Sequence, residues 1–187
     1  MGELGYELYI PAEFAQSVYD NIVRAGEPFG LQLAGYHALN SLRMEKAYRH
    51  WGHDIGDEDT PLEAGLGFAV AWNKPVDFVG REALRRLREA GVRRRLVALA
   101  LEETDRLLYH NEPVWRDGEL VGRITSGMFG HTVGRALGLG FIANRDGVAS
   151  AEWIKSGRYE VEVALQRVPA RISLRPFYDP AGERVRC

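Results

Sequence analysis

A short stretch near the start of the chain, GYELYIP at residues 5–11, places a carboxylate between aromatic rings. Side chains of a strand alternate between its two faces, so Glu7 and Tyr9 are expected to share one face. The opposite face would then be apolar and would belong to the core: Tyr6, Leu8 and Ile10. An acid beside a flat ring is either a rim of solvent-facing residues or half of a binding site.

Glu7 has two candidate kinds of partner, because a half-buried carboxylate on a strand needs hydrogen-bond donors. One is a structural arginine, such as Arg43. The other is a ligand with two adjacent N–H donors, and the 2-amino group and N3–H of a pterin ring match one carboxylate in a bidentate pair. Tyr9 would then line the face of the ring. The residues alone leave both possibilities open.

The sequence HWGHD at residues 50–54 offers two imidazoles and a carboxylate, which are ligand types that metal sites use. No third histidine lies nearby in the sequence, and the segment has the composition of a turn. We therefore favour a turn that Asp54 stabilises, and we expect no metal site.

Two other chemistries lack their sequence signals. Neither the glycines of residues 65–67 nor those of residues 138–140 have the G-x-G-x-x-G spacing or the lysine of a phosphate-binding loop. Ser126 and His131 lie close in sequence, but no G-x-S-x-G context accompanies them. The sequence thus argues against a nucleotide-binding loop and against a hydrolase.

The composition is that of an ordinary globular chain, with 187 residues of which 45% are hydrophobic. The 24 basic and 26 acidic side chains give a net charge of −2, which gives no reason to expect nucleic acid or a membrane surface as partner. A single cysteine, Cys187, fits a reducing compartment. Since no secretory signal is recognisable either, we expect a bacterial cytoplasmic protein, with the mitochondrial matrix as the alternative.

The first half of the chain mixes helical and strand patterns. Apolar residues recur every three to four positions over residues 11–25 and again over 35–47, which predicts two helices. Residues 68–72 have the pattern of a buried strand. Residues 81–90 predict a short basic helix with Leu84 and Leu87 facing inward.

The second half has the pattern of an all-β unit. Residues 94–101 predict a strand, and Asp117-Gly118 predicts a hairpin turn between two alternating runs. Residues 158–174 alternate, with these side chains expected on one face: Tyr159, Val161, Val163 and Leu165. The sequence predicts an α+β chain divided into residues 1–92 and a β-barrel or sandwich over residues 93–187.

Several longer motifs resemble one family in order and spacing: GELGYELYIP, LAGYHALNSLRMEKAYRHWGHDI, DTPLEAGLGFAV, DFVGREAL and PVWRDGELVGRITSGMFGHTVGRALGLGFI. The chain resembles the tetrahydrofolate-dependent aminomethyltransferases, the glycine-cleavage T protein and its relatives. NSLRMEKAYRHWGHDI is more similar to the folate domain at the C-terminus of dimethylglycine and sarcosine dehydrogenases or oxidases. Leu39 stands where stand-alone T proteins usually carry a folate-associated arginine, which also favours the dehydrogenase branch.

The resemblance implies part of a folate-binding aminomethyltransferase domain, followed by a C-terminal antiparallel β-barrel. It implies that an upstream FAD domain oxidises an N-methyl amine and that tetrahydrofolate captures the one-carbon unit as 5,10-methylenetetrahydrofolate. Carried over from the family, Glu7 would hold the pterin edge, Leu8 and Tyr9 would line the pocket, and Tyr178 in RPFYDP is a further folate candidate.

The resemblance also implies that the catalytic aspartate lies upstream of GYELY, so no catalytic residue is assigned here. We expect a fragment whose partners are folate and an upstream flavin domain or companion subunit. Its strand at 5–11 could pair copies of the chain into a homo-oligomer. The alternatives are an aminomethyltransferase of the glycine cleavage system and a non-catalytic folate-binding or interaction module.

Overall fold

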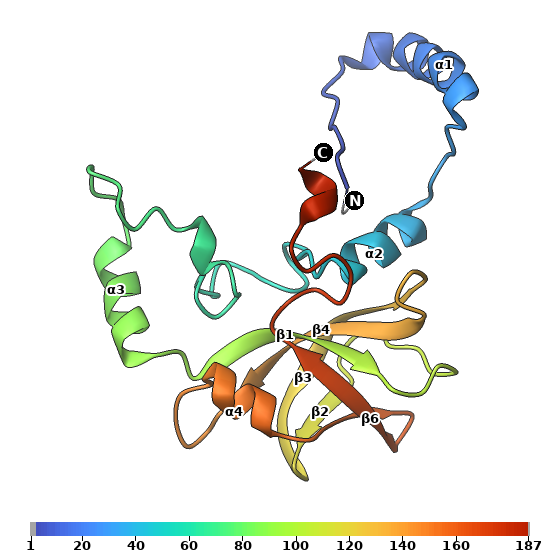
Figure 1. The fold of residues 1–187 in the computed structure, drawn as a ribbon. Helices are drawn as coiled ribbons and strands as arrows, with labels where there is room; N and C mark the ends of the chain where they lie inside the picture. Colours follow the sequence, from blue (N-terminus) through green and yellow to red (C-terminus); the bar gives the residue numbers. More distant parts are fainter. Residues whose placement is uncertain (1–2, 187) are drawn as a thin grey trace.

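The computed structural model describes residues 3–186, so the prediction about Cys187 lies outside the described residues (Figure 1). It is a mixed helix-and-strand chain in which the described strands close into an antiparallel barrel. The predicted α+β class with a C-terminal antiparallel barrel is therefore confirmed. Among the described residues, no helix has both the length and the apolar character needed to cross a membrane.

The barrel is built from six strands in the described part of the chain, in the order β1-β4-β3-β2-β5-β6, with β6 pairing back onto β1. The bounds are β1 Arg94–Leu101, β2 Pro113–Arg116, β3 Glu119–Gly130, β4 Arg135–Ala143, β5 Tyr159–Val163 and β6 Gln166–Ser173. The short helix α4 (Ala151–Ser156) precedes β5, and the Ser150 hydroxyl caps it by accepting from the Trp153 N–H. Closure leaves no strand edge free in this unit, because each strand pairs on both sides.

The predicted hairpin at Asp117-Gly118 is confirmed between β2 and β3. Both residues have positive φ, 50° and 89°, as a type I′ turn requires. A second hairpin joins β5 to β6, and Tyr159 and Val161 face the core as expected. Leu165 was predicted to face the core too, which is wrong. It lies in the turn of that hairpin at φ 63° and is exposed, because a tight turn ends the alternation.

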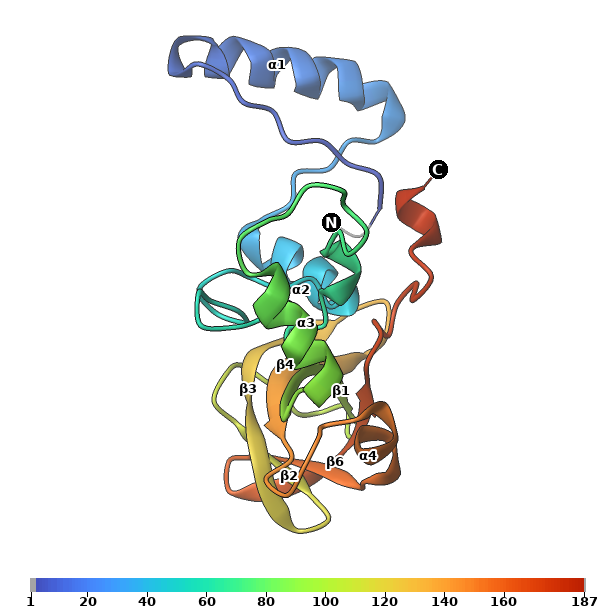
Figure 2. The same ribbon diagram turned by 90° about the vertical axis from the view of Figure 1, so that its left-hand side faces the viewer.

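The helices before the barrel match most of the expected ranges. The short helix η1 (Ala12–Phe14) leads into α1 (Ala15–Gly26) and η2 (Glu27–Phe29), followed by α2 (Tyr36–Glu45) and α3 (Arg81–Ala90). Leu84 and Leu87 are half-buried on α3. In both ribbon views α1 stands well away from the barrel, whereas α2 lies directly over one end of it (Figures 1 and 2).

The strand predicted at residues 5–11 is absent from the described structure. The segment is extended, but no described strand pairs with it. The backbone bonds at its two ends are from the Leu4 N–H to the Arg184 carbonyl and from the Phe14 N–H to the Pro11 carbonyl. Without a partner strand, the predicted apolar face stays exposed: Tyr6, Leu8 and Ile10.

The buried strand predicted at residues 68–72 is wrong as well. The backbone curls into the short helix η3 (Gly67–Ala69), and the Trp72 indole N–H donates to the Gly67 carbonyl at 3.2 Å. This side-chain bond closes a compact turn where an extended strand was expected. Phe68 points outward and is exposed.

Buried polar contacts join α2 to the barrel. The Glu45 carboxylate accepts from the backbone N–H groups of Thr132 and Val133, at 2.6 and 2.8 Å, although the residue is only 2% exposed. Ser41 donates to the Phe129 carbonyl at 2.7 Å. These bonds satisfy groups that would be costly to bury alone, so α2 is held firmly on the end of β3.

Candidate functional site

The residues predicted to hold folate lie on the exposed N-terminal segment. The Tyr9 hydroxyl donates to a Glu7 carboxylate oxygen at 3.0 Å, so the two side chains are neighbours as expected. This hydrogen bond raises the pKa of the Tyr9 phenol. Leu8 is exposed between them, on the opposite side of the extended backbone.

Tyr178 reaches the same end of the molecule from the C-terminal segment. Its hydroxyl donates to the Glu3 carboxylate at 3.1 Å, and its ring lies 5.9 Å from the Lys46 ammonium. Burial, followed by the bond to Glu3, raises the pKa of the Tyr178 phenol. No hydrogen bond joins Tyr178 to Glu7 or Tyr9 in the described part of the chain. The structure thus brings Tyr178 to the N-terminal segment, where it contacts Glu3 and not the Glu7 carboxylate.

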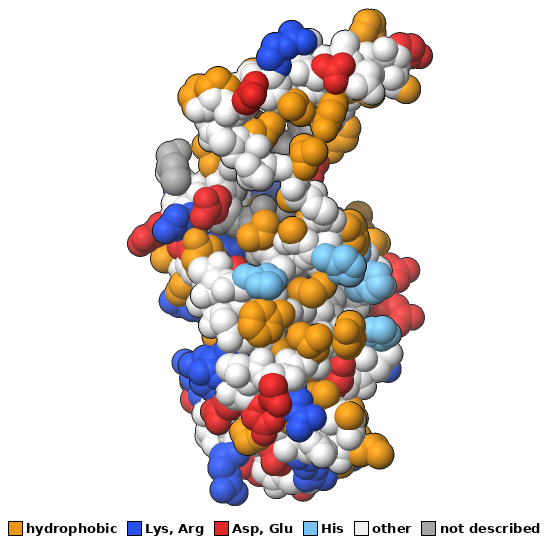
Figure 3. Space-filling model, turned by 90° about the vertical axis from the view of Figure 1, so that its right-hand side faces the viewer, with side chains coloured by type: hydrophobic (Ala, Val, Ile, Leu, Met, Phe, Trp, Pro, Cys, Tyr) orange, Lys and Arg blue, Asp and Glu red, His pale blue; other side chains and the backbone are white. Residues whose placement is uncertain are grey.

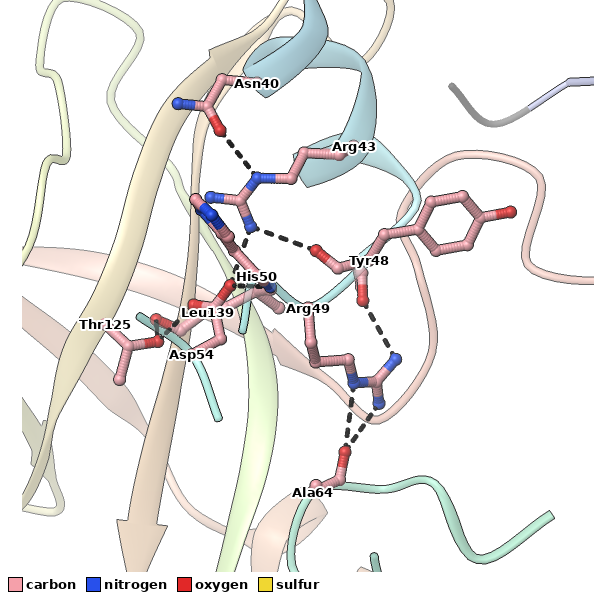
Figure 4. A network of polar contacts seen from close by, with 10 residues as sticks. Asn40, Arg43, Tyr48, Arg49, His50, Asp54, Ala64, Thr125 and Leu139 are labelled. Carbon is pink, nitrogen blue, oxygen red and sulfur yellow. Dashed lines mark hydrogen bonds and ion pairs between the residues drawn. The ribbon is translucent and has the colours of Figure 1, made fainter. Parts of the chain in front are cut away.

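Arg43 is not the partner of Glu7, which corrects one of the two possibilities drawn from the sequence. Figure 4 shows the Arg43 guanidinium turned toward Asp54, with Nη1 at 2.8 Å from Oδ2. Arg43 also donates to the Asn40 side chain and to the Tyr48 carbonyl. Both members of the ion pair are buried, so Arg43 is fully engaged inside the molecule.

Asp54 is the centre of this network. Besides Arg43, its carboxylate accepts from the His50 backbone N–H at 2.8 Å and from the Thr125 hydroxyl of β3 at 2.6 Å (Figure 4). It therefore stabilises the 50–54 turn, as predicted, and also ties that turn to the barrel. Among the described residues, no group of three or more histidine, cysteine or acidic side chains is arranged to hold a metal ion.

A cleft of about 750 Å³ opens beside this network. It lies between the first turns of α2, the 50–53 turn, the 107–111 loop and the middle of β3. Four of the five histidines line it: His37, His50, His53 and His110. The two histidines of residues 50–54 stand out in the sequence as candidate ligands. No sequence pattern predicts that they lie beside His37 and His110, because the fold alone brings these residues together.

The relatives found by comparison are much longer proteins. A 4-methylaminobutanoate oxidase (formaldehyde-forming) of Paenarthrobacter nicotinovorans is 47% identical over 186 residues, and a mitochondrial sarcosine dehydrogenase of Mus musculus is 40% identical over 187 residues. Both alignments cover 100% of this chain, but only 22% and 20% of the relatives. The chain thus spans about a fifth of the length of these relatives.

The structural comparison supports the same relationship at the level of fold. The crystal structure of the glycine cleavage system aminomethyltransferase T from Bartonella henselae matches with a TM-score of 0.77 and 21% sequence identity. The match covers 91% of this chain and 45% of that one.

Two family models complete the comparison and match consecutive parts of the sequence. The GCVT N-terminal domain matches residues 1–74, and the glycine cleavage T-protein C-terminal barrel domain matches residues 94–179. The second match contains all the barrel strands described above. The chain therefore belongs to the glycine-cleavage T-protein family, together with the related domains of sarcosine and dimethylglycine dehydrogenases.

Proposed function

We propose that this chain is the folate-dependent one-carbon transfer part of a flavin-dependent N-methylamine dehydrogenase-like enzyme. Its similarity to an N-methylamine oxidase and a sarcosine dehydrogenase over its whole length supports this branch of the family. Because those relatives are about five times longer, a flavin domain or companion subunit is the proposed partner. The substrate would be an N-methylated amine.

The state of Glu7 is the observation that carries the folate proposal. Its carboxylate is exposed and accepts one described hydrogen bond, from Tyr9. An ionised carboxylate offers about four lone-pair sites, so both oxygens remain able to accept from two parallel N–H groups of a pterin. The Tyr9 ring is also exposed and can cover a flat heterocycle. These residues fit the polar edge of tetrahydrofolate, which when bound would accept the one-carbon unit.

The remaining assignments follow from the same proposal. Leu8 would contact the folate from the exposed segment, and Tyr178 would border the pocket where the C-terminal segment meets Glu3. The division into residues 1–92 and 93–187 is proposed with it, since α3 ends at Ala90 and β1 begins at Arg94.

Calorimetric titration of the chain with 5-formyltetrahydrofolate, a stable reduced folate, tests the proposal. Replacing Glu7 by Gln keeps the shape but removes the charge, so Glu7→Gln should weaken binding about tenfold or more. Glu13→Gln is the matched control, because Glu13 is an exposed glutamate of η1 with no described side-chain partner. Equal affinity of the parent and Glu7→Gln would contradict the proposed clamp. A lack of binding by both this chain and a version extended upstream would contradict folate binding altogether.

A second candidate function differs in the fate of the one-carbon unit. The relative at 47% identity is named as formaldehyde-forming, which favours an enzyme that releases the unit. Turnover of the protein extended to the length of its relatives separates the two, with an N-methyl amino acid as substrate. Because released formaldehyde also condenses with tetrahydrofolate unaided, the measurement compares the parent with Glu7→Gln. A tetrahydrofolate-dependent fall in formaldehyde that is larger in the parent supports transfer, whereas an equal fall in both supports release and leaves this chain a binding module.

A further inference from the structure

The cleft beside α2 has the chemistry of a binding site that is separate from Glu7 and Tyr9, because neither residue lines it. Figure 3 shows histidine side chains gathered on this face of the molecule around a group of hydrophobic side chains. This face lies where α2, the 107–111 loop and β3 contact one another. A ligand here would touch both halves of the chain.

The described lining of the cleft contains no aspartate or glutamate. It contains two arginines, of which Arg43 is already paired with Asp54. The second, Arg123 on β3, is exposed and makes no described hydrogen bond or ion pair through its guanidinium. The cleft therefore offers one uncommitted cation, and nothing in its described lining neutralises it.

Other polar groups of the lining add donors. The Ser126 hydroxyl makes no hydrogen bond to a described residue, although Ser126 is only 7% exposed. The side-chain amide of Asn111 is likewise without a described partner at the rim. Uncommitted donors around a cation favour a ligand group that is anionic and rich in acceptors, such as a carboxylate.

Aromatic side chains supply the apolar part of the cleft. Tyr36 on α2, Tyr109 in the loop and Phe129 on β3 come from three separate elements. Flat rings of this kind favour a ligand with a flat apolar body. A zwitterionic N-methyl amino acid fits poorly, because its ammonium group would find no carboxylate in the described lining.

The backbone fixes the shape of the cleft before any ligand arrives. The Asn111 N–H donates to the Ile124 carbonyl at 2.7 Å, and the Ile124 N–H donates to the Glu112 carbonyl at 2.9 Å. These two bonds hold the 107–111 loop along β3. The loop also crosses β3 at Gly127, where an added Cβ would lie 2.3 Å from the Leu108 carbonyl carbon. Only glycine permits this close approach.

We infer that the cleft binds a small aromatic carboxylate, with Arg123 and Ser126 meeting the carboxylate and the aromatic side chains covering the ring. Two sources share this chemistry: the aminobenzoyl-glutamate part of a folate, or a separate aromatic acid. The first source rests on the proposed function, whereas the site itself rests on the lining of the cleft.

Titration of the ¹⁵N-labelled chain with 4-aminobenzoyl-L-glutamate, followed by NMR, tests the inference. Backbone amide signals of residues 107–111 should shift on binding. Arg123→Gln should weaken the affinity about tenfold or more, and so should exchange of the probe for the uncharged 4-aminobenzamide. Ser126→Ala should weaken it less. Arg86→Gln is the matched control, since Arg86 is an exposed arginine on α3 outside the cleft.

Three results would overturn the inference: no shift in residues 107–111, unchanged affinity in Arg123→Gln, or equal binding of the neutral amide. The source of the carboxylate is decided by adding 5-formyltetrahydrofolate. If that ligand depends on both Glu7 and Arg123, the folate tail occupies the cleft. Dependence on Glu7 alone keeps the proposed function and removes the cleft from it. If only aminobenzoyl-glutamate binds, and through Arg123, the cleft serves a separate aromatic acid and the folate proposal fails.

Discussion

The barrel and the N-terminal segment of residues 3–36 have similar apolar patterns but opposite environments. In the barrel, Leu99 and Ile124 are completely buried. In the N-terminal segment, Tyr9 and Phe29 are about nine-tenths exposed, at 90% and 89%. Both views show α1 standing apart from the rest of the chain (Figures 1 and 2). The barrel closes on itself, whereas the N-terminal segment has an apolar surface that the described residues leave uncovered.

This contrast shows what hydrophobic alternation does and does not specify. Alternation determines which side chains would share a face, but burial requires a second surface. Every barrel strand finds that surface within the described chain. The extended segment around Glu7 does not, and the same openness leaves its carboxylate available for a ligand.

The largest expected effect comes from removing the Asp54 carboxylate, which ties the 50–54 turn to the barrel. Asp54→Ala leaves the Arg43 guanidinium buried without its carboxylate partner and leaves the Thr125 hydroxyl with only the Leu139 carbonyl. Loss of one member of a buried pair costs about 3–5 kcal/mol in free energy of unfolding. Urea unfolding measures the loss. Asp57→Ala is the control, because Asp57 is exposed in the same loop. Equal stability of the two variants would show that the network does not hold the turn on the barrel.

The second prediction tests the comparison itself. Leu99→Ala removes a fully buried side chain of β1 and should lower the free energy of unfolding by roughly 2–5 kcal/mol. Leu8→Ala removes an exposed one and should change it by no more than about 0.5 kcal/mol. Both are measured by urea unfolding at several protein concentrations. A comparable loss in Leu8→Ala would mean that the N-terminal segment is covered in solution, and a dependence on concentration would identify a second copy as the cover.

The sequence predicted the barrel well because its signals are local. The Asp117-Gly118 turn and the apolar run of β1 specify their own conformations. The two failed strands, at residues 5–11 and 68–72, depended on something that alternation cannot supply. The first lacks a described partner strand, and the second is curled by the bond from the Trp72 indole to the Gly67 carbonyl.

The candidate site divides in the same way. Glu7 and Tyr9 lie two residues apart, so their contact was predictable from the spacing. The pairing of Arg43 with Asp54 spans eleven residues and a turn, and the sequence offered Arg43 only as one of two possible partners of Glu7. The cleft could not be predicted from the sequence, because His110 and Arg123 come close to α2 only once the barrel has closed.

The third prediction concerns the close approach that shapes the cleft. Gly127→Ala would press a methyl group against the Leu108 backbone, which has little freedom because the loop is bonded to β3. The expected loss of unfolding free energy is about 1–3 kcal/mol, the usual cost of an overpacked site. Gly35→Ala is the control, since its added methyl group would meet open space at an ordinary φ of −81°. Thermal unfolding measures the two losses. Equal losses of stability in Gly35→Ala and Gly127→Ala would show that the 107–111 loop shifts away from the added methyl group at little cost.

The smallest effect is confined to acid pH and concerns the C-terminal segment, where Asp179 contacts Lys46 at the end of α2. The Lys46 ammonium donates to Asp179 at 2.7 Å and, with two backbone N–H groups, lowers the pKa of that carboxyl from 3.8 to about 2. Between these values the unfolded chain binds more protons than the folded chain. The stabilisation is therefore fully present above about pH 4 and disappears as the pH falls through about 2.

Asp179→Asn removes this titration while keeping the size of the side chain. The stability difference between the parent and Asp179→Asn should be constant above about pH 4 and should shrink steadily toward pH 2. Urea unfolding at fixed ionic strength across this range measures it. Lys46→Met should reduce the same pH dependence, because it removes the ammonium that lowers the Asp179 pKa most and leaves the two backbone N–H donors in place. A difference that stays constant down to pH 2 would mean that the pair does not form in solution, and that the C-terminal segment, with Tyr178, is not held against α2.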